Sequence, residues 1–558
     1  MKKILLAILP YWDPMIPPMG ITSLKRFLQG YGYTVRTIDL IVKKECLDYY
    51  TDYFDTLKKY IPYEKRGNFR NIGHDVLQNQ MMAHLNYDNF EEYAQLVKLL
   101  IYYHYYEEVN HQCAVELIKL TDDYYKMLEN YFLTLLEEER PDVLGVTAFK
   151  CTLPSSLFVL KLAKQKYPQI KTIMGGGTFN ESHAPDSPSF DALLKYSEGY
   201  LDKIILGQGE LLFLKYLKGE LPESQRVYTI DDIDGHYLDF HELEIPDFSD
   251  LDLSVYPCMS ASASASCLYN CSFCVSKKVN GPYRKNKPDR VVNYMTKLYN
   301  LHGHQLFFMT DSLINPVISD LAKEFIKSDI ALYYDSYFKV DDASADINNT
   351  LLWRKGGLYR VRLGAESGSQ KILNAMNKLI TPEQIVASIK GLAYAGIKTT
   401  TYWVIGHPGE SEADFQATLD VIEECKNDIF QTECNYFLYH YSKQASEHEW
   451  AKDRISLYPE WADKMLIFKY WTLDRYPLRE EAFDRVHRFE AHCRKLGIPN
   501  PYSLSEYFEA DSRWKKLHKN AVPAMADFKN FNSYIDECKN IQTISFAAAN
   551  IDDSDFDF

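Results

Sequence analysis

Apolar residues recur along the first part of the chain in short runs that alternate with helical spacings. The run KILLAIL (residues 3–9) predicts a buried strand, and MGITSLKRFLQGYG after it predicts an amphipathic helix. The stretches YTVRTIDL, DVLGVTAF (residues 142–149), KTIMGGG and LDKIILGQGE predict further strands, with helices between them. Strands that alternate with helices are typical of a parallel, doubly wound sheet. We therefore expect a Rossmann-like α/β domain over residues 1–228.

A tyrosine-rich insertion, roughly residues 42–140, separates the second and third predicted strands. It contains DYYTDYF, LIYYHYYEEV and DDYYKMLENYF, and its apolar residues recur at helical spacing. This pattern predicts a set of packed helices. We expect the tyrosines to form core and packing surface, and a substrate-facing aromatic wall is the alternative.

The second half of the chain repeats the strand–helix alternation after a polar stretch. Residues 229–257 are acidic and lack periodicity, which predicts an interdomain linker. The small-residue strand CMSASASAS then ends at Cys267, and QLFFMTDS, IALYYDS, LYRVRLGAES and IKTTTYWVIGHPGE each precede a helical stretch. These strands predict a second α/β unit, barrel-like and incomplete, over residues 258–434. Residues 435–545 are expected to be mainly helical, and residues 546–558 to form a flexible acidic tail.

Composition narrows the class of protein. The chain has 558 residues, 46% of them hydrophobic, and a formal net charge of −15. Such a balance disfavours a large basic surface for nucleic acid. No stretch approaches the roughly 20 apolar residues of a membrane helix. The apolar run near the N-terminus is followed by YWDPMIPPMG instead of a small-residue cleavage site, so a strand explains it better than a signal peptide. We expect a cytoplasmic protein that binds neither membrane nor nucleic acid.

Three cysteines lie within eight residues, in CLYNCSFC, and define a C-x₃-C-x₂-C spacing at Cys267, Cys271 and Cys274. Structural zinc needs four ligands, and Cys258 would lie roughly 25 to 30 Å from Cys267 along an extended strand. Buried thiols without a cofactor are a second alternative. A four-iron cluster held by three thiolates fits best, because it leaves one iron open for a ligand. The other eight cysteines are scattered, as buried thiols in a long intracellular chain usually are: Cys46, Cys113, Cys151, Cys258, Cys425, Cys434, Cys493 and Cys538.

The cysteine motif resembles that of the radical S-adenosylmethionine (radical SAM) superfamily. FFMTDS (residues 307–312), RLGAESGSQKILNAMNK (362–378) and VIGHPGES (404–411) resemble further stretches of that family in the expected order. The resemblance implies a partial (β/α)₆ TIM-like barrel in which Cys267, Cys271 and Cys274 hold a 4Fe–4S cluster. It also implies an S-adenosylmethionine site formed by Phe273, Thr310, Asp311, Ser312, Glu366, Ser367, Ile405 and Gly406.

The N-terminal half resembles the cobalamin-binding domain of cobalamin-dependent radical SAM enzymes. The similar stretches are LPYWDPMIPPMGITSLKRFLQGYGYTVRTIDL, DVLGVTAF, GGGTFNES and IILGQGE. Two departures are that no D-x-H-x-x-G histidine motif is present and that Gln208 stands where an acidic residue is usual. Cobalamin without a protein imidazole on cobalt is therefore expected, and a retained fold without cobalamin is the alternative. The resemblance implies a cobalamin site at Pro18, Gly20, Thr147, Gly175, Gly176, Gly177, Gly207 and Glu210.

These resemblances imply an enzyme that cleaves S-adenosylmethionine to a 5′-deoxyadenosyl radical. Cobalamin-dependent methylation of an unactivated carbon in a ribosomal peptide or another natural-product precursor is the expected reaction. Cyclisation or rearrangement on a vestigial cobalamin fold is an alternative, and a non-catalytic metal- or cobalamin-binding partner is another. The implied partners are a peptide or small-molecule substrate and an electron donor such as flavodoxin or ferredoxin.

Overall fold

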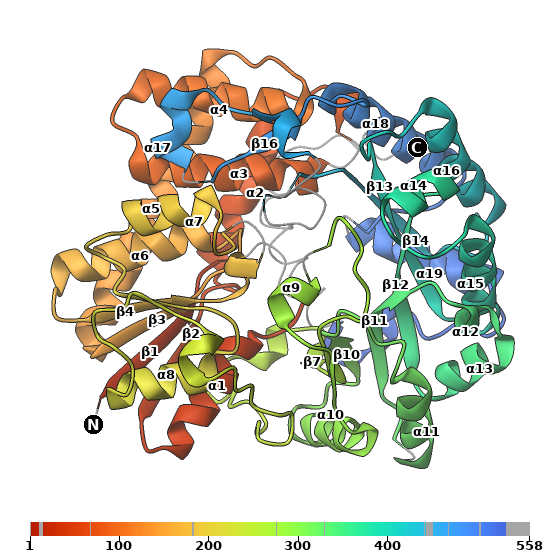
Figure 1. Cartoon of the computed structure of the whole chain (residues 1–558), viewed down its shortest axis with the longest axis horizontal. Coiled ribbons are helices and arrows are strands. Elements are labelled where there is room, and N and C mark those ends of the chain that lie inside the picture. Colours follow the sequence, from red (N-terminus) through yellow and green to blue (C-terminus); the bar gives the residue numbers. More distant parts are fainter. Residues whose placement is uncertain are drawn as a thin grey trace.

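The computed structural model of the chain describes residues 2–10, 15–66, 69–180, 183–274, 276–328, 330–439, 441, 450–466, 468–501 and 504–531. Two parallel sheets occupy the two halves of the chain, the first on the left and the second on the right of Figure 1. The predicted acidic tail, residues 546–558, lies outside the described residues.

The first sheet is parallel, six-stranded and covered on both faces. Its order is β2-β1-β3-β4-β5-β6. Ile4, Leu6 and Ile8 pack with α1 and α8, whereas Leu5 and Ala7 join the core on the opposite face. This alternation confirms the doubly wound sheet and explains why its first strand is a continuous apolar run. The elements are β1 (Lys3–Ile8), α1 (Met19–Gly30), β2 (Thr34–Asp39), β3 (Val143–Thr147), α6 (Leu153–Lys166), β4 (Lys171–Gly175), α7 (Pro188–Tyr196), β5 (Lys203–Ile205), α8 (Gly209–Lys218) and β6 (Val227–Tyr228).

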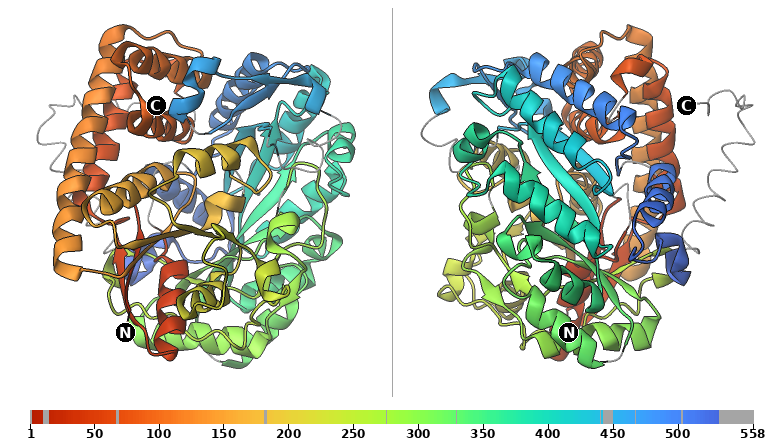
Figure 2. Two further views of the ribbon diagram at one scale, coloured as in Figure 1. Left: turned by 60° about the vertical axis from the view of Figure 1, so that its left-hand side comes forward. Right: turned by 90° about the vertical axis from the view of Figure 1, so that its right-hand side faces the viewer.

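The insertion between β2 and β3 is helical, as its apolar spacing predicts. Its long helices stand together at the upper left of Figure 1 and form one wall of the molecule in Figure 2. They are α2 (Lys44–Lys58), α3 (Phe69–Asn86), α4 (Phe90–Tyr105) and α5 (His111–Glu139). The core prediction is confirmed for the tyrosines that the structure buries, namely Tyr49, Tyr50, Tyr53, Tyr93, Tyr105, Tyr124 and Tyr125.

The acidic stretch between the two sheets packs against the first half of the chain. The Lys25 ammonium of α1, which is buried, lies 2.7 Å from Asp250 Oδ2 and 3.4 Å from Asp247 Oδ2. Tyr256 also donates a hydrogen bond to Asp39 at the end of β2. The segment predicted as a linker is thus held by ion pairs and hydrogen bonds. It contains the short turns η3 (Ile230–Ile233) and η4 (Leu253–Val255).

The second sheet is parallel, with the order β14-β13-β12-β11-β10-β7, and its end strands β7 and β14 do not pair among the described residues. This arrangement confirms the predicted incomplete six-stranded barrel. The strands are β7 (Met259–Ala261), β10 (Leu306–Met309), β11 (Tyr333–Lys339), β12 (Leu358–Glu366), β13 (Lys398–Ile405) and β14 (Gln431–Tyr436). The accompanying helices are α10 (Pro288–His302), α11 (Ile318–Ser328), α12 (Asp342–Ala345), α13 (Ile347–Lys355), α14 (Gln370–Ala375), α15 (Pro382–Tyr394) and α16 (Glu412–Glu424).

The start of the barrel differs from the prediction. The expected single strand up to Cys267 stops at Ala261, and a separate short strand, β8 (Ser264–Ala265), pairs antiparallel with β9 (Arg284–Lys285). The turn between β7 and β8 is fixed by Asp311, which accepts hydrogen bonds from Ala263 N and Ser264 Oγ. A side chain distant in sequence therefore ends the first strand early.

The C-terminal part is mainly helical, as predicted, but it also contains a hairpin. The helices are α17 (Asp463–Leu466), α18 (Arg479–Lys495) and α19 (Leu504–Leu517), and the hairpin pairs β15 (Arg454–Ser456) with β16 (Trp471–Leu473). The segment between these two strands reaches the insertion, where Lys464 Nζ lies 2.5 Å from Asp88 Oδ2. Among the described helices, none combines the length and the apolar character needed to cross a membrane.

Candidate active site

The lumen of the barrel is charged below its mouth. Arg360 Nε and Arg362 Nη2 donate to the same Asp335 oxygen, at 2.8 and 3.1 Å. Burial raises the pKa of Asp335, but Arg362 and Arg360 hold it below its ordinary value. Arg362 also stacks over the Phe308 ring at 4.0 Å. The lumen is thus a fixed polar network, and its open end is where the strand-end loops gather.

The cysteine loop follows β8 at this open end. Cys267 and Cys271 are half-buried, and Cys274 is exposed and accepts a hydrogen bond from Ser276 N at 3.5 Å. The other described cysteines are buried, apart from half-buried Cys151. Thiols that are reduced, partly exposed and close in sequence are suited to binding iron.

The geometry does not favour the zinc alternative. The sulfur ligands of a single tetrahedral zinc lie about 4 Å apart. Among the described residues, a group of three potential metal ligands whose ligand atoms all lie within 4.8 Å of one another occurs once. It is the exposed set Asp239, His241 and Glu242, and the three cysteines of the loop do not form such a group. Cys258 is 5% exposed and packs in an apolar cluster, where burial raises its pKa to about 12. It is therefore no fourth ligand to the cysteine loop.

The turn after α14 holds the cysteine loop in place. Ser272 N donates to Met376 O at 2.9 Å, and Asn377 Nδ2 donates to Asn270 O at 2.9 Å. Asn377 and Leu379 adopt positive φ angles of 51° and 58°. Such conformations are rare for residues other than glycine and are concentrated at functional sites. The end of the motif RLGAESGSQKILNAMNK thus shapes the candidate metal site.

Lys378 joins this turn to Glu366 at the end of β12. Its ammonium donates to Glu366 Oε1 at 2.6 Å, and both side chains are buried. Glu366 has a φ of 65°. A Cβ at Gly364 would lie 2.5 Å from Glu366 Oε1 and 2.8 Å from Lys378 Nζ, so a side chain there would displace the ends of this ion pair.

A second lysine lies beside the same loop. Lys339 Nζ, at the end of β11, donates to Lys378 O at 2.6 Å and lies 4.6 Å from the Tyr269 ring. Burial and the neighbouring Lys378 lower the pKa of Lys339 to about 8. Lys378 itself lies 5.8 Å from the Phe273 ring. Two cationic side chains therefore flank the cysteines, which favours an anionic cluster there.

The end of β10 also reaches the cysteine loop. Ser312 Oγ lies 2.8 Å from Ser276 Oγ, two residues beyond Cys274. Asp311 is buried, and burial raises its pKa to about 6. Its carboxylate serves the β7–β8 turn, so Thr310 and Ser312 are the exposed side chains of this strand end.

Three predicted S-adenosylmethionine contacts have structural partners in the chain. Ser367 is buried, and its Oγ accepts from Ser369 N at 3.1 Å. Ile405 is buried in the barrel core. Gly406 has a φ of 76°, and a Cβ there would lie 2.4 Å from Ala482 Cβ, so α18 packs directly on this glycine. Contact of these residues with S-adenosylmethionine stays a prediction.

The carboxyl ends of the first sheet bring most of the predicted cobalamin residues together. Gly20 and Gly176 both lie next to Thr147. A Cβ atom added at Gly20 would lie 3.9 Å from Thr147 Oγ1, and one added at Gly176 would lie 2.8 Å from it. Gly176 has a φ of 110°, and its Cβ would lie 2.5 Å from Ala148 O. Ala148 N also donates to Gly175 O at 2.7 Å. These glycines let the loops after β3 and β4 approach each other closely.

The rest of this rim is open. Gly207 has a φ of 83° with nothing within 4 Å of a Cβ, and Phe149, which adjoins Gly177, is 44% exposed. Burial raises the pKa of half-buried Glu210 in the first turn of α8. Pro18 differs, because it is buried and its carbonyl accepts from Thr22 Oγ1 at 2.8 Å. Exposed glycine backbone beside an exposed ring is a surface that fits a flat ligand such as a corrin.

Sequence reasoning missed two lysines at the site, Lys339 and Lys378, and Arg479, which lies on the other side of β14. Lys378 ends a motif that the sequence singles out, but Lys339 and Arg479 have no local signal. Arg479 begins α18, and its guanidinium lies 4.6 Å from the ring of Tyr436 at the end of β14.

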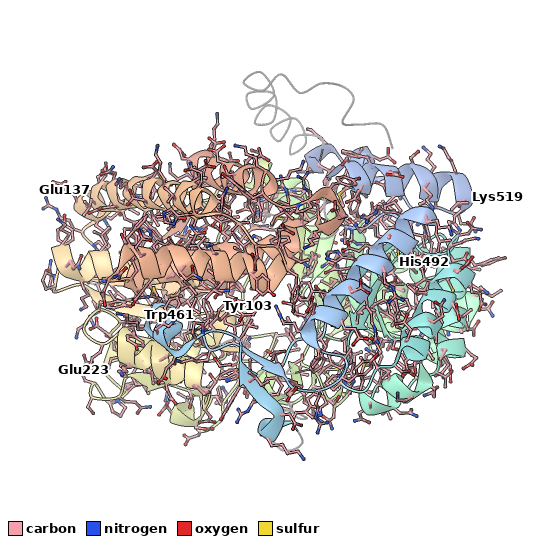
Figure 3. All side chains as sticks on the ribbon, turned by 90° about the horizontal axis from the view of Figure 1, so that it is seen from above. Tyr103, Glu137, Glu223, Trp461, His492 and Lys519 are labelled. Atoms are coloured by element: carbon pink, nitrogen blue, oxygen red, sulfur yellow. The ribbon has the colours of Figure 1, made fainter. Side chains whose placement is uncertain are left out.

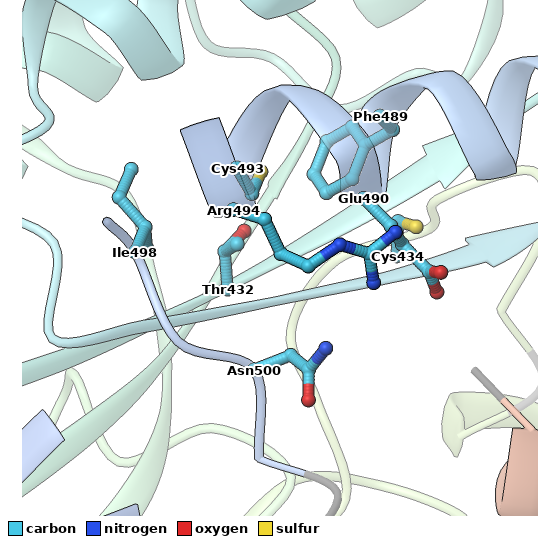
Figure 4. A pocket seen from close by; sticks show the side chains of 8 residues that line it. All are labelled: Thr432, Cys434, Phe489, Glu490, Cys493, Arg494, Ile498 and Asn500. Atoms are coloured by element: carbon cyan, nitrogen blue, oxygen red, sulfur yellow. The ribbon is translucent and has the colours of Figure 1, made fainter. Parts of the chain in front are cut away.

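A further pocket, shown in Figure 4, lies between β14 and α18 and is not part of this site. Glu490 of α18 is 4% exposed, and neither of its carboxylate oxygens has a hydrogen-bond partner among the described residues. Cys434 and Cys493, both buried, line the same pocket. This pocket is on the side of β14 that faces α18, away from the cysteine loop.

The barrel and its cysteine loop define a class of protein. Residues 262–422 match the family model of the Radical SAM superfamily. This segment contains the cysteine loop, Glu366 and the ends of β10 to β13. The chain therefore carries a radical SAM domain over these residues.

Two curated relatives match about half of the chain. An anaerobic magnesium-protoporphyrin IX monomethyl ester cyclase of Rubrivivax gelatinosus is 26% identical over 320 residues, 52% of this chain and 55% of the cyclase. An uncharacterized methyltransferase of Pyrococcus horikoshii is 24% identical over 325 residues, 53% of this chain and 67% of the methyltransferase.

A solved structure shares the fold over nearly the whole chain. The radical S-adenosylmethionine methyltransferase TsrM from Kitasatospora setae, with tryptophan substrate and a SAM analogue bound, superposes with a TM-score of 0.57 at 13% identity. The match covers 98% of this chain and 100% of TsrM. TsrM with cobalamin and a 4Fe–4S cluster bound gives 0.55 at 15% identity. These matches support the fold prediction.

Proposed function

We propose that the chain is a cobalamin-dependent radical SAM methyltransferase in which Cys267, Cys271 and Cys274 hold a 4Fe–4S cluster. The observation that most directly supports this proposal is the set of three partly exposed thiols at the barrel mouth, flanked by Lys339 and Lys378. The donor set fits a cluster because the loop offers three soft ligands and nearby positive charge. When bound, the cluster supplies the electron that cleaves S-adenosylmethionine to a 5′-deoxyadenosyl radical.

The chain's own residues bind and orient the reactants. Lys378 fixes the Glu366 carboxylate at the end of β12, where it can accept a hydrogen bond from a hydroxyl or amino group of S-adenosylmethionine. Thr310 and Ser312 present further hydroxyl groups at the end of β10. Lys378 also belongs to the turn that forms hydrogen bonds with the cysteine loop. The same turn would therefore position both the cluster site and the S-adenosylmethionine site.

The open rim of the first sheet would hold cobalamin, which supplies a methyl group when bound. Gly20, Gly176 and Gly207 are exposed there and would permit close approach of backbone to the corrin. The rim adjoins the C-terminal segment that borders the barrel mouth, since Lys150 after β3 lies 5.7 Å from the Tyr470 ring. Figure 1 shows α9 (Ser276–Asn280), which follows the cysteine loop, between the two sheets.

The test of cobalamin binding is direct. Protein reconstituted anaerobically with hydroxocobalamin is desalted and its absorbance spectrum recorded. We expect about one equivalent of corrin to remain, with the spectrum of cobalamin that has no imidazole on cobalt. Complete loss of corrin would leave a radical SAM enzyme on a vestigial cobalamin fold.

Ring closure is the second candidate reaction, because one sequence relative is a cyclase. Mass spectrometry of the product separates the two reactions, since methylation adds one methylene and ring closure removes two hydrogens. The proposed substrate is a ribosomal peptide or another natural-product precursor, and the proposed electron donor is a flavodoxin or ferredoxin. Release of 5′-deoxyadenosine from S-adenosylmethionine would exclude a purely binding role.

Replacing Lys378 with glutamine is expected to lower the midpoint potential of the reconstituted cluster by several tens of millivolts. The change removes a positive charge next to the thiolates but keeps an N–H donor for Glu366. A potentiometric titration followed by electron paramagnetic resonance measures the shift. Lys371→Gln is the control, because Lys371 is exposed and pairs with Asp414. An unchanged potential at full iron content would show that Lys378 has only a structural role.

A further inference from the structure

The segment that follows the cysteine loop is basic, although the chain as a whole is acidic. Residues 276–290 contain six lysines or arginines and one acidic residue, whereas the whole chain has a formal net charge of −15. Four of these cationic side chains are exposed, and none of the four forms an ion pair with another described residue. We call this set the basic patch, and its members are Lys277, Lys285, Lys287 and Arg290.

The basic patch lies beside the cysteine loop in space. In the antiparallel pair of β8 and β9, Lys285 is opposite Ser264, three residues before Cys267. Paired strands are about 4.8 Å apart, so Lys285 lies next to the strand that leads into the loop. On the other side of the loop, Lys277 is three residues beyond the exposed Cys274. A partner bound to the basic patch would therefore lie next to the exposed edge of the loop.

Two exposed leucines border the same loop. Leu268 directly follows the first cysteine and is 53% exposed, and Leu379 is 72% exposed. Leu379 belongs to the turn in which Asn377 donates a hydrogen bond to Asn270 O, so both leucines flank the loop. Interfaces between proteins commonly combine an apolar centre with a polar or charged rim. Exposed apolar side chains beside a basic patch are therefore typical of a surface that binds a protein.

We infer that the basic patch docks an acidic electron-transfer protein of the flavodoxin type, which reduces the cluster proposed at the cysteine loop. The inference rests on the proposed function, because an electron donor is needed only if a cluster is present. Opposite charges on the two proteins would speed their association and orient the donor toward the loop. One electron passes from the reduced flavin to the cluster, so that the flavin is oxidised by one electron and no bond forms or breaks.

A nucleic acid is the competing occupant of a basic surface. The basic patch is bounded on one side by acidic residues, because Arg284 stacks over the ring of Tyr237, which shortly precedes the exposed Asp239 and Glu242. An extended phosphate backbone needs a longer stripe of positive charge than one short segment supplies. A small acidic protein fits the patch better.

The test measures binding and electron transfer separately. Protein reconstituted anaerobically with iron and sulfide is titrated calorimetrically with oxidised flavodoxin at low ionic strength. Cluster reduction by fully reduced flavodoxin is then followed by stopped-flow absorbance. Replacing Lys285 and Lys287 together with glutamate is expected to weaken binding, and to slow reduction, by about tenfold or more. Added salt should weaken binding to the wild type as well, because exposed charges are screened.

Lys119→Glu combined with Lys161→Glu is the matched control, because it changes the net charge equally at two exposed lysines of the other half of the chain. Lys119 lies on α5, whose end is marked by Glu137 at the left of Figure 3, whereas the barrel half is on the right. The control should bind flavodoxin and accept its electron as the wild type does. Iron analysis of both variants shows whether the cluster site is intact.

Four outcomes would overturn the inference. They are no binding of flavodoxin to the wild type, binding that salt does not affect, equal binding to the Lys285 and Lys287 variant at full iron content, and variant-sensitive binding of transfer RNA without binding of flavodoxin. Dithionite with methyl viologen supplies electrons without docking. If this mixture reduces the wild-type cluster and S-adenosylmethionine is cleaved, the proposed function survives each of these results. Loss of iron and of cleavage in the wild type would instead refute the proposed function.

Discussion

Replacing Cys267, Cys271 and Cys274 together with alanine is expected to lower the iron content of anaerobically reconstituted protein from about four atoms per chain to less than one. The three thiols are the proposed ligands, and no fourth thiol approaches them from Cys258, which is buried elsewhere. The fold should survive, because the three side chains are half-buried or exposed and contribute little to the core. Iron analysis and far-ultraviolet circular dichroism measure the two outcomes.

Cys151→Ala provides the matched control for this change. Cys151 is also half-buried, but it follows β3 in the other half of the chain. Its replacement should leave the iron content unchanged. Stoichiometric zinc and no iron in the wild-type protein after anaerobic reconstitution would contradict the cluster assignment.

The two sheets could be predicted because most strands have apolar side chains on both faces or clear flanking turns. β1 is apolar on both faces, since Ile4 and Leu5 enter different cores. β14 could not be predicted, because Glu433 and Asn435 alternate with buried Thr432 and Cys434 and interrupt any apolar run. Because the residues of β14 that face the barrel lumen are polar, the strand has no apolar pattern by which it could be predicted.

The site could be predicted where its residues are close in sequence. The cysteines lie within one loop, and Glu366 and Lys378 lie within one motif. Arg479 could not be predicted, because its partner Tyr103 is 376 residues away. Such a contact depends on the placement of the insertion against the barrel, which no local pattern encodes.

The second prediction is that the free energy of unfolding depends on pH through Glu490, which lies in the pocket shown in Figure 4. Burial raises the pKa of Glu490 to about 8; Arg494 lowers it and Glu506 raises it further. In the unfolded chain the carboxyl has an ordinary pKa near 4.5. Between these two values the folded state binds one more proton than the unfolded state, so the free energy of unfolding falls as the pH rises.

Glu490→Gln is expected to remove this dependence. At pH 5 both proteins carry a neutral side chain in the pocket, so their free energies of unfolding should be similar. At pH 8.5 the wild type must either keep a proton on Glu490 at a cost or bury a charge that has no hydrogen-bond partner among the described residues. The variant should then be more stable by about 3 to 5 kcal/mol, which is the pKa difference converted to free energy. Urea unfolding at the two pH values measures the difference.

Glu480→Gln is the control for the titration of other carboxyl groups, because Glu480 lies on the same helix and is exposed. Its replacement should leave the wild-type fall in stability between pH 5 and pH 8.5 intact. A wild-type free energy of unfolding that stays constant over this range would contradict the neutral state of Glu490. A variant less stable than the wild type at pH 8.5 would mean that the carboxylate is charged and paired in the folded protein.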